Sequence, residues 1–195
     1  AVGHDLSRYG VRYRQLPTWI KPEVRPGFHR FHPAPGVYVI GATPLQGMYL
    51  PDRSTFDWFL RQDPDDQIGY SMLIYDVEQD PLQRRWVGVC GDPEPPLSAE
   101  EVLAGFGIPD PRVLYFRCRT SGVIPGEGGA GWYIVPASAE NAGSPVAEWL
   151  EGAEVEFEQY DGEGNLAFTV YGLESAPAVS VGADSSVEIV RGDAP

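Results

Sequence analysis

The sequence is short of the side chains on which most catalytic motifs depend. Its 195 residues include three histidines and two cysteines. No G-x-S-x-G, H-E-x-x-H or Walker-type phosphate loop is present. Residues 126–131 match the pattern G-x-G-x-x-G, but a strand pattern follows them where a dinucleotide-binding fold needs a helix. We therefore interpret this segment as a loop and expect no cofactor.

Long apolar runs and basic residues are also scarce. No run approaches the roughly 18 apolar residues of a membrane-spanning helix, and no leader pattern opens the chain, so we expect it to be soluble as it stands. The net charge is −14: residues 1–85 hold ten acidic and ten basic side chains, whereas residues 86–195 hold 18 acidic and four basic ones. Such an acidic surface repels phosphate, so we expect no nucleic-acid partner.

Residues 36–77 contain three predicted elements. Val37–Ile40 is an apolar run of strand length between two glycines, which predicts a buried strand. Residues 54–63 have the apolar spacing of a short helix, and residues 68–77 are again dense in strand formers. A short helical crossover between two buried strands predicts that the strands are parallel.

The same order of patterns recurs later in the chain. The predicted elements are a strand at 86–90, a helix at 98–106, a strand at 113–116, a strand at 132–135, a helix at 144–150 and a strand from 155. A turn at 161–164 predicts an antiparallel hairpin with 168–171, and one more strand is expected at 187–190.

These patterns predict an α/β fold with a parallel or mixed sheet built from repeated strand–helix–strand units, and we interpret the recurrence as a diverged internal duplication. The expected N-terminal half, residues 1–85, consists of a Pro- and Arg-rich N-terminal arm at 1–35 and the unit at 36–77. The second α/β half covers residues 86–175. Residues 176–195 form a small, polar C-terminal tail.

Several motifs of the N-terminal half occur in an order that resembles a known family. They are Tyr9-Gly10-Val11, Leu45-Gln46-Gly47, Trp58-Phe59-Leu60, Pro64, and Ile68-Gly69-Tyr70-Ser71-Met72-Leu73-Ile74-Tyr75. In this order they look like the soluble C-terminal, extracytoplasmic domain of bacterial membrane glycosyltransferases of the mannosyltransferase or aminoarabinose-transferase type, which use lipid-phosphate-linked sugar donors. The resemblance covers about residues 9–77 and continues more weakly through Cys90 and Cys118.

The resemblance implies a location and partners but no catalytic residue. In that family the catalytic carboxylate and the donor site lie in the membrane-embedded part, none of which is in this sequence. The chain would then be a non-catalytic accessory domain at the extracytoplasmic face of the cell membrane. Its partners would be the membrane-embedded part of the same polypeptide and a carbohydrate or lipid-linked sugar.

Two alternatives come from other functional classes. One is a free-standing soluble α/β enzyme whose site lies at the carboxyl ends of the strands, near Cys90, Asp92 and Thr43. The other is a structural interaction module without a catalytic site. We expect this chain alone not to be catalytic, and Cys90 and Asp92 are only weak candidates for a catalytic role.

The two cysteines have three interpretations. Cys90 and Cys118 each follow a strand of one strand–helix–strand unit, so neighbouring strands would bring both side chains to the same edge of the sheet. A disulfide fits an extracytoplasmic domain, two free buried thiols fit a cytosolic protein, and Cys90 as a nucleophile would need a histidine base. All histidines lie in the N-terminal arm.

Aromatic residues are the candidates for binding sugar or a partner. Trp58 lies off the apolar stripe of its predicted helix, and Trp19 lies in the N-terminal arm; exposed tryptophans commonly stack on sugar faces or anchor partners. The competing interpretation is that both cover the edge of the core between the two halves. His29 and His32 are interpreted as loop residues, and no metal site is expected.

The carboxylates that cluster in the sequence are the other candidates for chemistry. Asp63, Asp65 and Asp66 follow the first predicted helix, and Asp92 and Glu94 lie beside Cys90. Either group could supply paired carboxylates for acid and base work on a sugar. We interpret both as solvated acidic loops.

Overall fold

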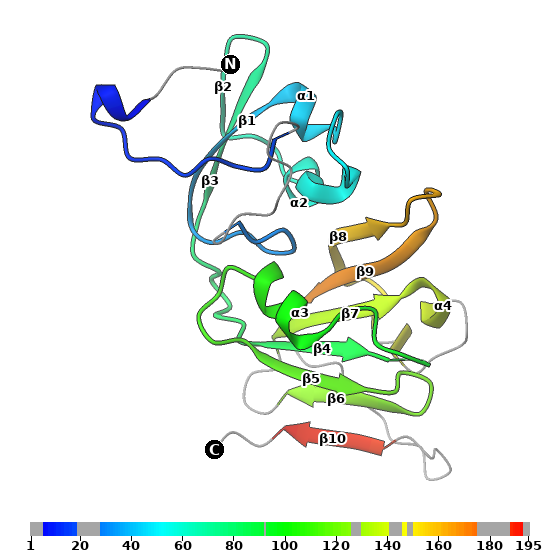
Figure 1. Cartoon of the computed structure of the whole chain (residues 1–195). Helices are drawn as coiled ribbons and strands as arrows, with labels where there is room; N and C mark the ends of the chain where they lie inside the picture. Colours follow the sequence, from blue (N-terminus) through cyan, green and yellow to red (C-terminus); the bar gives the residue numbers. More distant parts are fainter. Residues whose placement is uncertain are drawn as a thin grey trace.

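The computed structural model describes residues 6–18, 28–91, 93–125, 130–140, 146–147, 150–174 and 188–192. They form a mixed α/β fold with a three-stranded, a five-stranded and a two-stranded sheet (Figure 1). The predicted α/β class and the mixed sheet are confirmed. Within the described residues, no helix is long and apolar enough to cross a membrane.

The elements follow one another with short connections in most of the chain. In order they are η1 (Leu6–Tyr9), β1 (Gly36–Gly41), α1 (Ala42–Leu45), η2 (Arg53–Phe56), α2 (Asp57–Leu60), β2 (Asp66–Ile68), β3 (Met72–Val77), β4 (Trp86–Cys90), α3 (Ala99–Gly105), β5 (Arg112–Phe116), β6 (Ser121–Pro125), β7 (Gly131–Pro136), α4 (Ala137–Glu140), β8 (Glu154–Tyr160), β9 (Leu166–Leu173) and β10 (Glu188–Gly192).

The three-stranded sheet corrects the predicted parallel pair. Its order is β1-β3-β2, and β3 is antiparallel both to β1 and to β2. The apolar run at 68–77 is therefore the end of one strand, a tight turn and a second strand. Gly69, with a φ of 61°, lies in this turn in a left-handed conformation that glycine adopts without steric cost. The turn reverses the chain, so β3 returns antiparallel to β1.

The five-stranded sheet has the order β5-β4-β7-β9-β8. β4 is parallel to β5 and to β7, whereas β9 is antiparallel to β7 and to β8. The predicted strand–helix–strand unit formed by β4, α3 and β5 is confirmed. Its helix α3 begins at a capping box in which Ser98 and Glu101 satisfy each other's backbone N–H groups.

The predicted third unit is wrong in its strand pairing. β9 lies between β7 and β8, so β8 is not a neighbour of β7, while the predicted β8–β9 hairpin is confirmed. The helix predicted at 144–150 lies partly outside the described residues. Because only one of three predicted units has parallel neighbouring strands, the interpretation as repeated parallel units is not supported.

The two-stranded sheet at the bottom of Figure 1 contains one strand, β6, that the sequence analysis missed. β6 pairs in parallel with β10, and β10 falls on the strand predicted at 187–190. The predicted turn at 161–164 is also present, since the N–H of Asp161 donates to the carbonyl of Asn165 at 2.9 Å.

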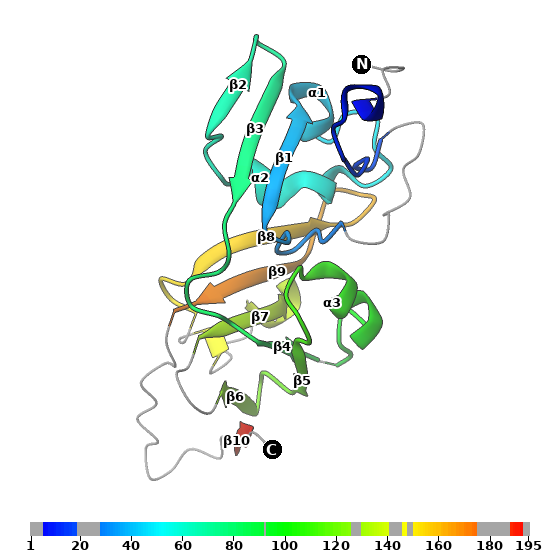
Figure 2. The ribbon, with the colours of Figure 1, turned by 90° about the vertical axis from the view of Figure 1, so that its left-hand side faces the viewer.

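The N-terminal arm crosses between the two larger sheets through residues 28–34, which we call the strap (Figure 2). Its Phe28 packs in the core beneath the three-stranded sheet, and its Phe31 packs in the core of the five-stranded sheet. The backbone N–H groups of Phe31 and His32 donate to the Gly105 carbonyl at 2.8 and 3.2 Å. The strap is thus held by side chains and backbone alike.

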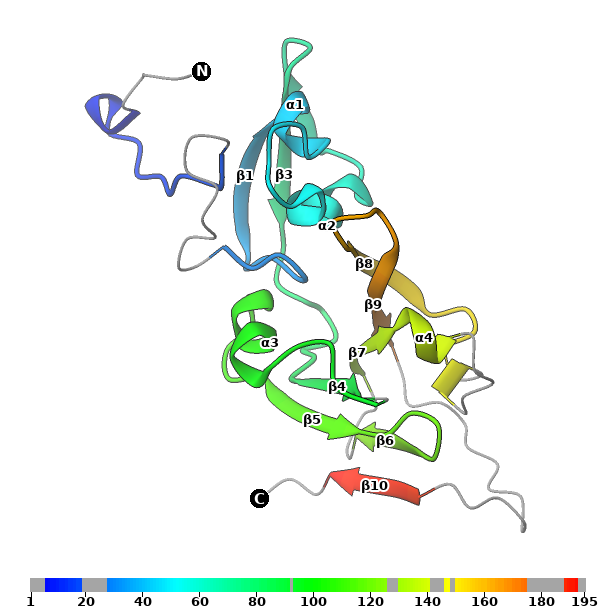
Figure 3. The same cartoon turned by 45° about the vertical axis from the view of Figure 1, so that its right-hand side comes forward.

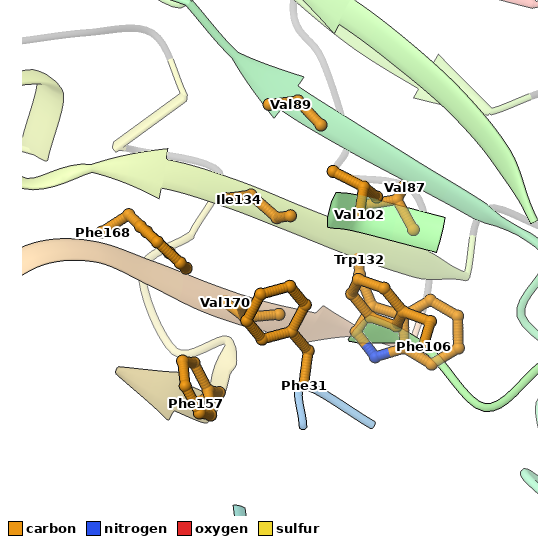
Figure 4. Packing of buried hydrophobic residues seen from close by; sticks show 10 residues of the cluster. All are labelled: Phe31, Val87, Val89, Val102, Phe106, Trp132, Ile134, Phe157, Phe168 and Val170. Atoms are coloured by element: carbon orange, nitrogen blue, oxygen red, sulfur yellow. The ribbon is translucent and has the colours of Figure 1, made fainter. Parts of the chain in front are cut away.

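Phe31 is the central contact of the strap. Figure 4 shows it among the side chains of the five-stranded sheet, and its ring lies 5.0 Å from that of Phe157 and 5.6 Å from that of Phe106. Gly105 leaves room for it, because a Cβ there would overlap the Phe31 ring. The residue is 2% exposed.

We expect Phe31→Ala to lower the free energy of unfolding by about 3–5 kcal/mol, because it removes a buried ring and leaves a cavity between the strap and the sheet. Urea unfolding followed by circular dichroism measures the change. Leu103→Ala is the control: this side chain on α3 is 44% exposed, so its replacement should change stability by no more than about 0.5 kcal/mol. Equal losses for the two variants would contradict a central role for Phe31.

Candidate functional site

The two cysteines form a disulfide at one end of the parallel pair β4 and β5. Cys90 is the last residue of β4, Cys118 follows β5 by two residues, and their Cα atoms lie 5.3 Å apart. Both side chains are 0% exposed. In this form Cys90 has no thiol with which to act as a nucleophile.

The other predicted site residues do not converge. Trp58 on α2 is half-buried, and its ring packs against Phe59 at 5.0 Å and against His32 at 6.0 Å. It therefore lies at the junction of the two halves. Trp19 and Asp92 lie outside the described residues.

Residues of the predicted carboxylate clusters are exposed. Asp63, Asp65 and Asp66 lie on the surface before and within β2, and Glu94 is exposed as well. Thr43 lies on α1, in the other half of the molecule from Cys90. Among the described residues, no three histidine, cysteine, aspartate or glutamate side chains are grouped to hold a metal ion.

A buried carboxylate at the junction is the most unusual polar feature of the molecule. Glu156 on β8 is 4% exposed. Its Oε1 accepts hydrogen bonds from Arg84 at 3.1 Å and from the indole N–H of Trp132 at 3.0 Å. Its Oε2 lies 3.1 Å from Nδ1 of His32. Both carboxylate oxygens are satisfied, as a buried charge requires.

Two backbone features create the space for this carboxylate. The pairing of β8 with β9 shifts register between Val155 and Phe157, so a bulge directs Glu156 toward the junction. Gly172 lies on the neighbouring strand β9 beside the Glu156 side chain, and a Cβ at position 172 would overlap Oε1 of Glu156. In its present position the carboxylate thus occupies space that a side chain at 172 would need, and such a side chain would displace it.

Arg84 connects this carboxylate to the segment between the two halves. Its Nε donates to the carbonyl of Leu173 at 3.2 Å, and its guanidinium lies 5.3 Å from the centre of the Trp132 ring. The carboxylate of Asp80 also accepts from the backbone N–H of Arg84 at 2.8 Å. The chain between β3 and β4 is thereby fixed to β9.

A second set of charged side chains continues along β8. Arg61 pairs with Asp57 at 2.8 Å and with Glu158 at 2.6 Å. Burial disfavours the charge on Arg61, but hydrogen bonds and charge interactions with Asp57 and Glu158 outweigh it and raise its pKa. Arg30 pairs with Asp52 at 2.7 Å and donates to Gln159. We call these contacts, together with those of Glu156, the polar seam.

One end of the polar seam opens into a groove of about 670 Å³ between η2 and the β8–β9 hairpin. It is lined by Pro51, Asp52, Arg53, Ser54, Asp57, Tyr160, Asp161, Gly162, Glu163 and Gly164. Both halves of the molecule thus contribute walls. The lining is rich in hydrogen-bonding groups and includes one aromatic ring, that of Tyr160, which is 42% exposed.

The ionisation states in the groove follow from its hydrogen bonds. Tyr160 donates to Glu158 at 2.9 Å, and this bond, with a smaller effect of burial, raises the pKa of its hydroxyl. Hydrogen bonds from Asn165 and other groups of the turn lower the pKa of Asp161. At neutral pH the groove therefore presents a protonated Tyr160 and an ionised Asp161.

The histidines of the strap differ in their surroundings. Burial, with the nearby charges of Arg14 and His32, lowers the pKa of His29. His32 lies between the rings of Trp58 and Trp132 and faces Glu156. His32 lies in a loop, as interpreted, but the strap places it half-buried against a buried carboxylate.

Sequence reasoning missed the residues that matter most at the junction. Glu156, Arg84 and the groove-lining Tyr160 were not singled out, although Glu154, Glu156 and Glu158 alternate along a strand pattern. Alternation of this kind predicts that the acidic side chains share one face of a strand, but the bulge between Val155 and Phe157 breaks the alternation. The pattern also does not show that an arginine-bearing segment covers that face.

Comparisons with family models, curated proteins and solved structures found no match for this chain.

We expect loss of the disulfide to lower the free energy of unfolding by about 3–4 kcal/mol in the chain-entropy model, since the two cysteines are 28 residues apart. Urea unfolding of Cys90→Ala/Cys118→Ala, beside the oxidised protein, measures the loss. Intact mass before and after reduction checks the bond itself. Two free thiols in oxidised, unfolded protein would contradict it.

We expect Glu156→Ala to lower the free energy of unfolding by about 3–5 kcal/mol, because it leaves the buried Arg84 with only the more distant Asp80 carboxylate, at 3.8 Å, and leaves the Trp132 indole N–H without its acceptor. Glu154→Ala on the exposed part of the same strand is the matched control and should stay within about 0.5 kcal/mol. Gly172→Ala should be more harmful in the native chain than in the Glu156→Ala background, since the overlap involves the Glu156 carboxylate. Additive losses would argue against that contact.

Proposed function

We propose that this chain is a non-catalytic, extracytoplasmic accessory domain of a membrane glycosyltransferase, and that its groove positions the sugar acceptor. The observation that carries the proposal is the groove between η2 and the β8–β9 hairpin. Its volume of about 670 Å³ lies within the range of small-molecule sites.

The chemistry of the groove suits a polyhydroxylated ligand. Asp57 and Asp161 offer carboxylate oxygens that accept hydrogen bonds from sugar hydroxyls. The half-exposed ring of Tyr160 offers a face on which the apolar side of a pyranose can stack. A strongly anionic ligand fits less well, because carboxylates outnumber Arg53 among the lining residues.

The disulfide supports the proposed compartment. Disulfides persist in oxidising surroundings such as the extracytoplasmic space and are rare in the cytosol of most organisms. Cys90 and Cys118 are fully buried and form such a bond. The bond also argues against an enzyme with a Cys90 nucleophile, because the thiol is absent in this form.

The test is titration of the oxidised protein with methyl α-mannoside and α-mannobiose, followed by saturation-transfer and chemical-shift NMR. We expect saturable binding with a dissociation constant on the order of 1 mM, as for a small ligand in an open groove. Tyr160→Ala should weaken binding by about tenfold, because it removes the stacking face and leaves the carboxylates in place.

Tyr115→Ala is the matched control for this titration. Tyr115 is 46% exposed, close to the value for Tyr160, and lies on β5 at the opposite edge of the five-stranded sheet. Its replacement should leave sugar binding unchanged. Equal effects of the two variants, or no saturable response to either sugar, would overturn the proposed acceptor site.

A further inference from the structure

The N-terminal arm contains a projecting segment, residues 6–15, that we call the basic segment. Residues 7–15 are exposed without interruption, and Tyr9, Val11 and Tyr13 are 77%, 48% and 50% exposed. Figures 1 and 3 show this segment standing away from the sheets. Leu16, which follows it, packs against the core of the three-stranded sheet. An anchored segment that exposes three large apolar side chains is a candidate for contact with a partner.

The three-stranded sheet has an apolar face that no described element covers. Its strand register places Val37, Val39, Ile74, Met72 and Ile68 on one face, opposite the face on which α1 and α2 pack (Figure 2). Val37, Val39 and Ile68 are 67%, 43% and 61% exposed. We call this surface the outer face.

The charges of the two surfaces are complementary. The outer face carries Asp66 and Asp76, both exposed. The basic segment carries Arg8, Arg12 and Arg14. Among the described residues, none of these five side chains forms an ion pair. Arginine can lay its aliphatic part on an apolar surface while its guanidinium reaches a carboxylate at the margin.

The length of the basic segment also agrees with that of the outer face. Residues 10–15 are six residues without helical structure, which span about 20 Å when extended. β3, also six residues long, has a similar length of about 20 Å. The basic segment can therefore lie along the whole outer face.

We propose that two copies of this chain exchange their basic segments, so that the segment of each protomer lies on the outer face of the other. Reciprocal exchange doubles the contact. Tyr9 and Tyr13 of both copies would together bury about 600–1,000 Å², and the apolar faces they cover add a similar area, which reaches the range of specific interfaces, about 1,200–2,000 Å². The contact is separate from the groove and does not depend on the proposed acceptor site.

Sedimentation velocity across a concentration series tests the exchange. We expect a dimer that dissociates more readily at high salt, because its ion pairs are near the surface. Arg12→Glu/Arg14→Glu and Asp66→Lys/Asp76→Lys should each raise the dissociation constant by at least about tenfold. Glu151→Lys/Glu154→Lys, at exposed positions away from both surfaces, is the control and should leave it unchanged. Circular dichroism checks that all variants are folded.

A mixing experiment separates exchange from other contacts. Each of the two charge-reversal variants should be a monomer when it is alone. In a homodimer of Arg12→Glu/Arg14→Glu the acidic segment would meet an acidic outer face, and in a homodimer of Asp66→Lys/Asp76→Lys the basic segment would meet a basic outer face. Mixed, every segment meets a face of opposite charge, so a heterodimer should form. Heterodimer formation would establish contact between copies, since docking of the segment on its own face cannot produce it.

Several outcomes would overturn the proposal. The first is a native chain that stays monomeric at all concentrations. The second is a dimer whose dissociation constant is unchanged by both charge reversals. The third is a mixture of the two variants that remains monomeric. Binding of the native monomer to phosphatidylcholine vesicles, reduced by Val37→Asp/Val39→Asp, would assign the outer face to a bilayer instead. Failure of sugar binding would leave the exchange unaffected.

Discussion

The structure depends on the neutralisation of one buried carboxylate. A buried, unpaired Glu156 would cost several kcal/mol, and its partners come from three separate parts of the chain: His32 from the strap, Arg84 from the connection to β4, and Trp132 from β7. The charge is satisfied only when all three segments are in place. The two halves therefore have one favoured arrangement, which apolar packing alone would define less sharply.

The same strand that carries this carboxylate also forms the groove. β8 proceeds from Glu156 at the junction through Glu158 in the polar seam to Tyr160 at the groove. The opposite wall, at η2 and α2, is held to β8 by Arg61, which binds carboxylates from both sides. The groove exists because the two halves are fixed together, so the position of its wall residues follows from the polar seam. Walls fixed in this way are preorganised, which would reduce the entropic cost of binding the proposed sugar ligand.

Local patterns predicted what depends on local contacts. The helix that begins at Ser98, the parallel pair around it and the β8–β9 hairpin follow from residues close in sequence. The orientation of β3 did not, because the turn at 69–71 lies inside a run dense in strand formers and only Gly69 and Ser71 mark it. The niche of Glu156 was also beyond prediction: a bulge and the absence of a side chain at Gly172 leave no periodic signal.

The uneven charge of the sequence acquires a structural meaning at the junction. The acidic second half presents Glu156 and Glu158 on β8, and the N-terminal half supplies the arginines that meet them, Arg84 and Arg61. Residues 1–85 have no net charge, yet some of their arginines pair with carboxylates of the second half. The arginines of the basic segment have no such partner among the described residues, although they belong to the same half. Arg61 and Arg84 show that cations of this half can serve contacts outside it, and the exposed arginines of the basic segment are available for the proposed contact between copies.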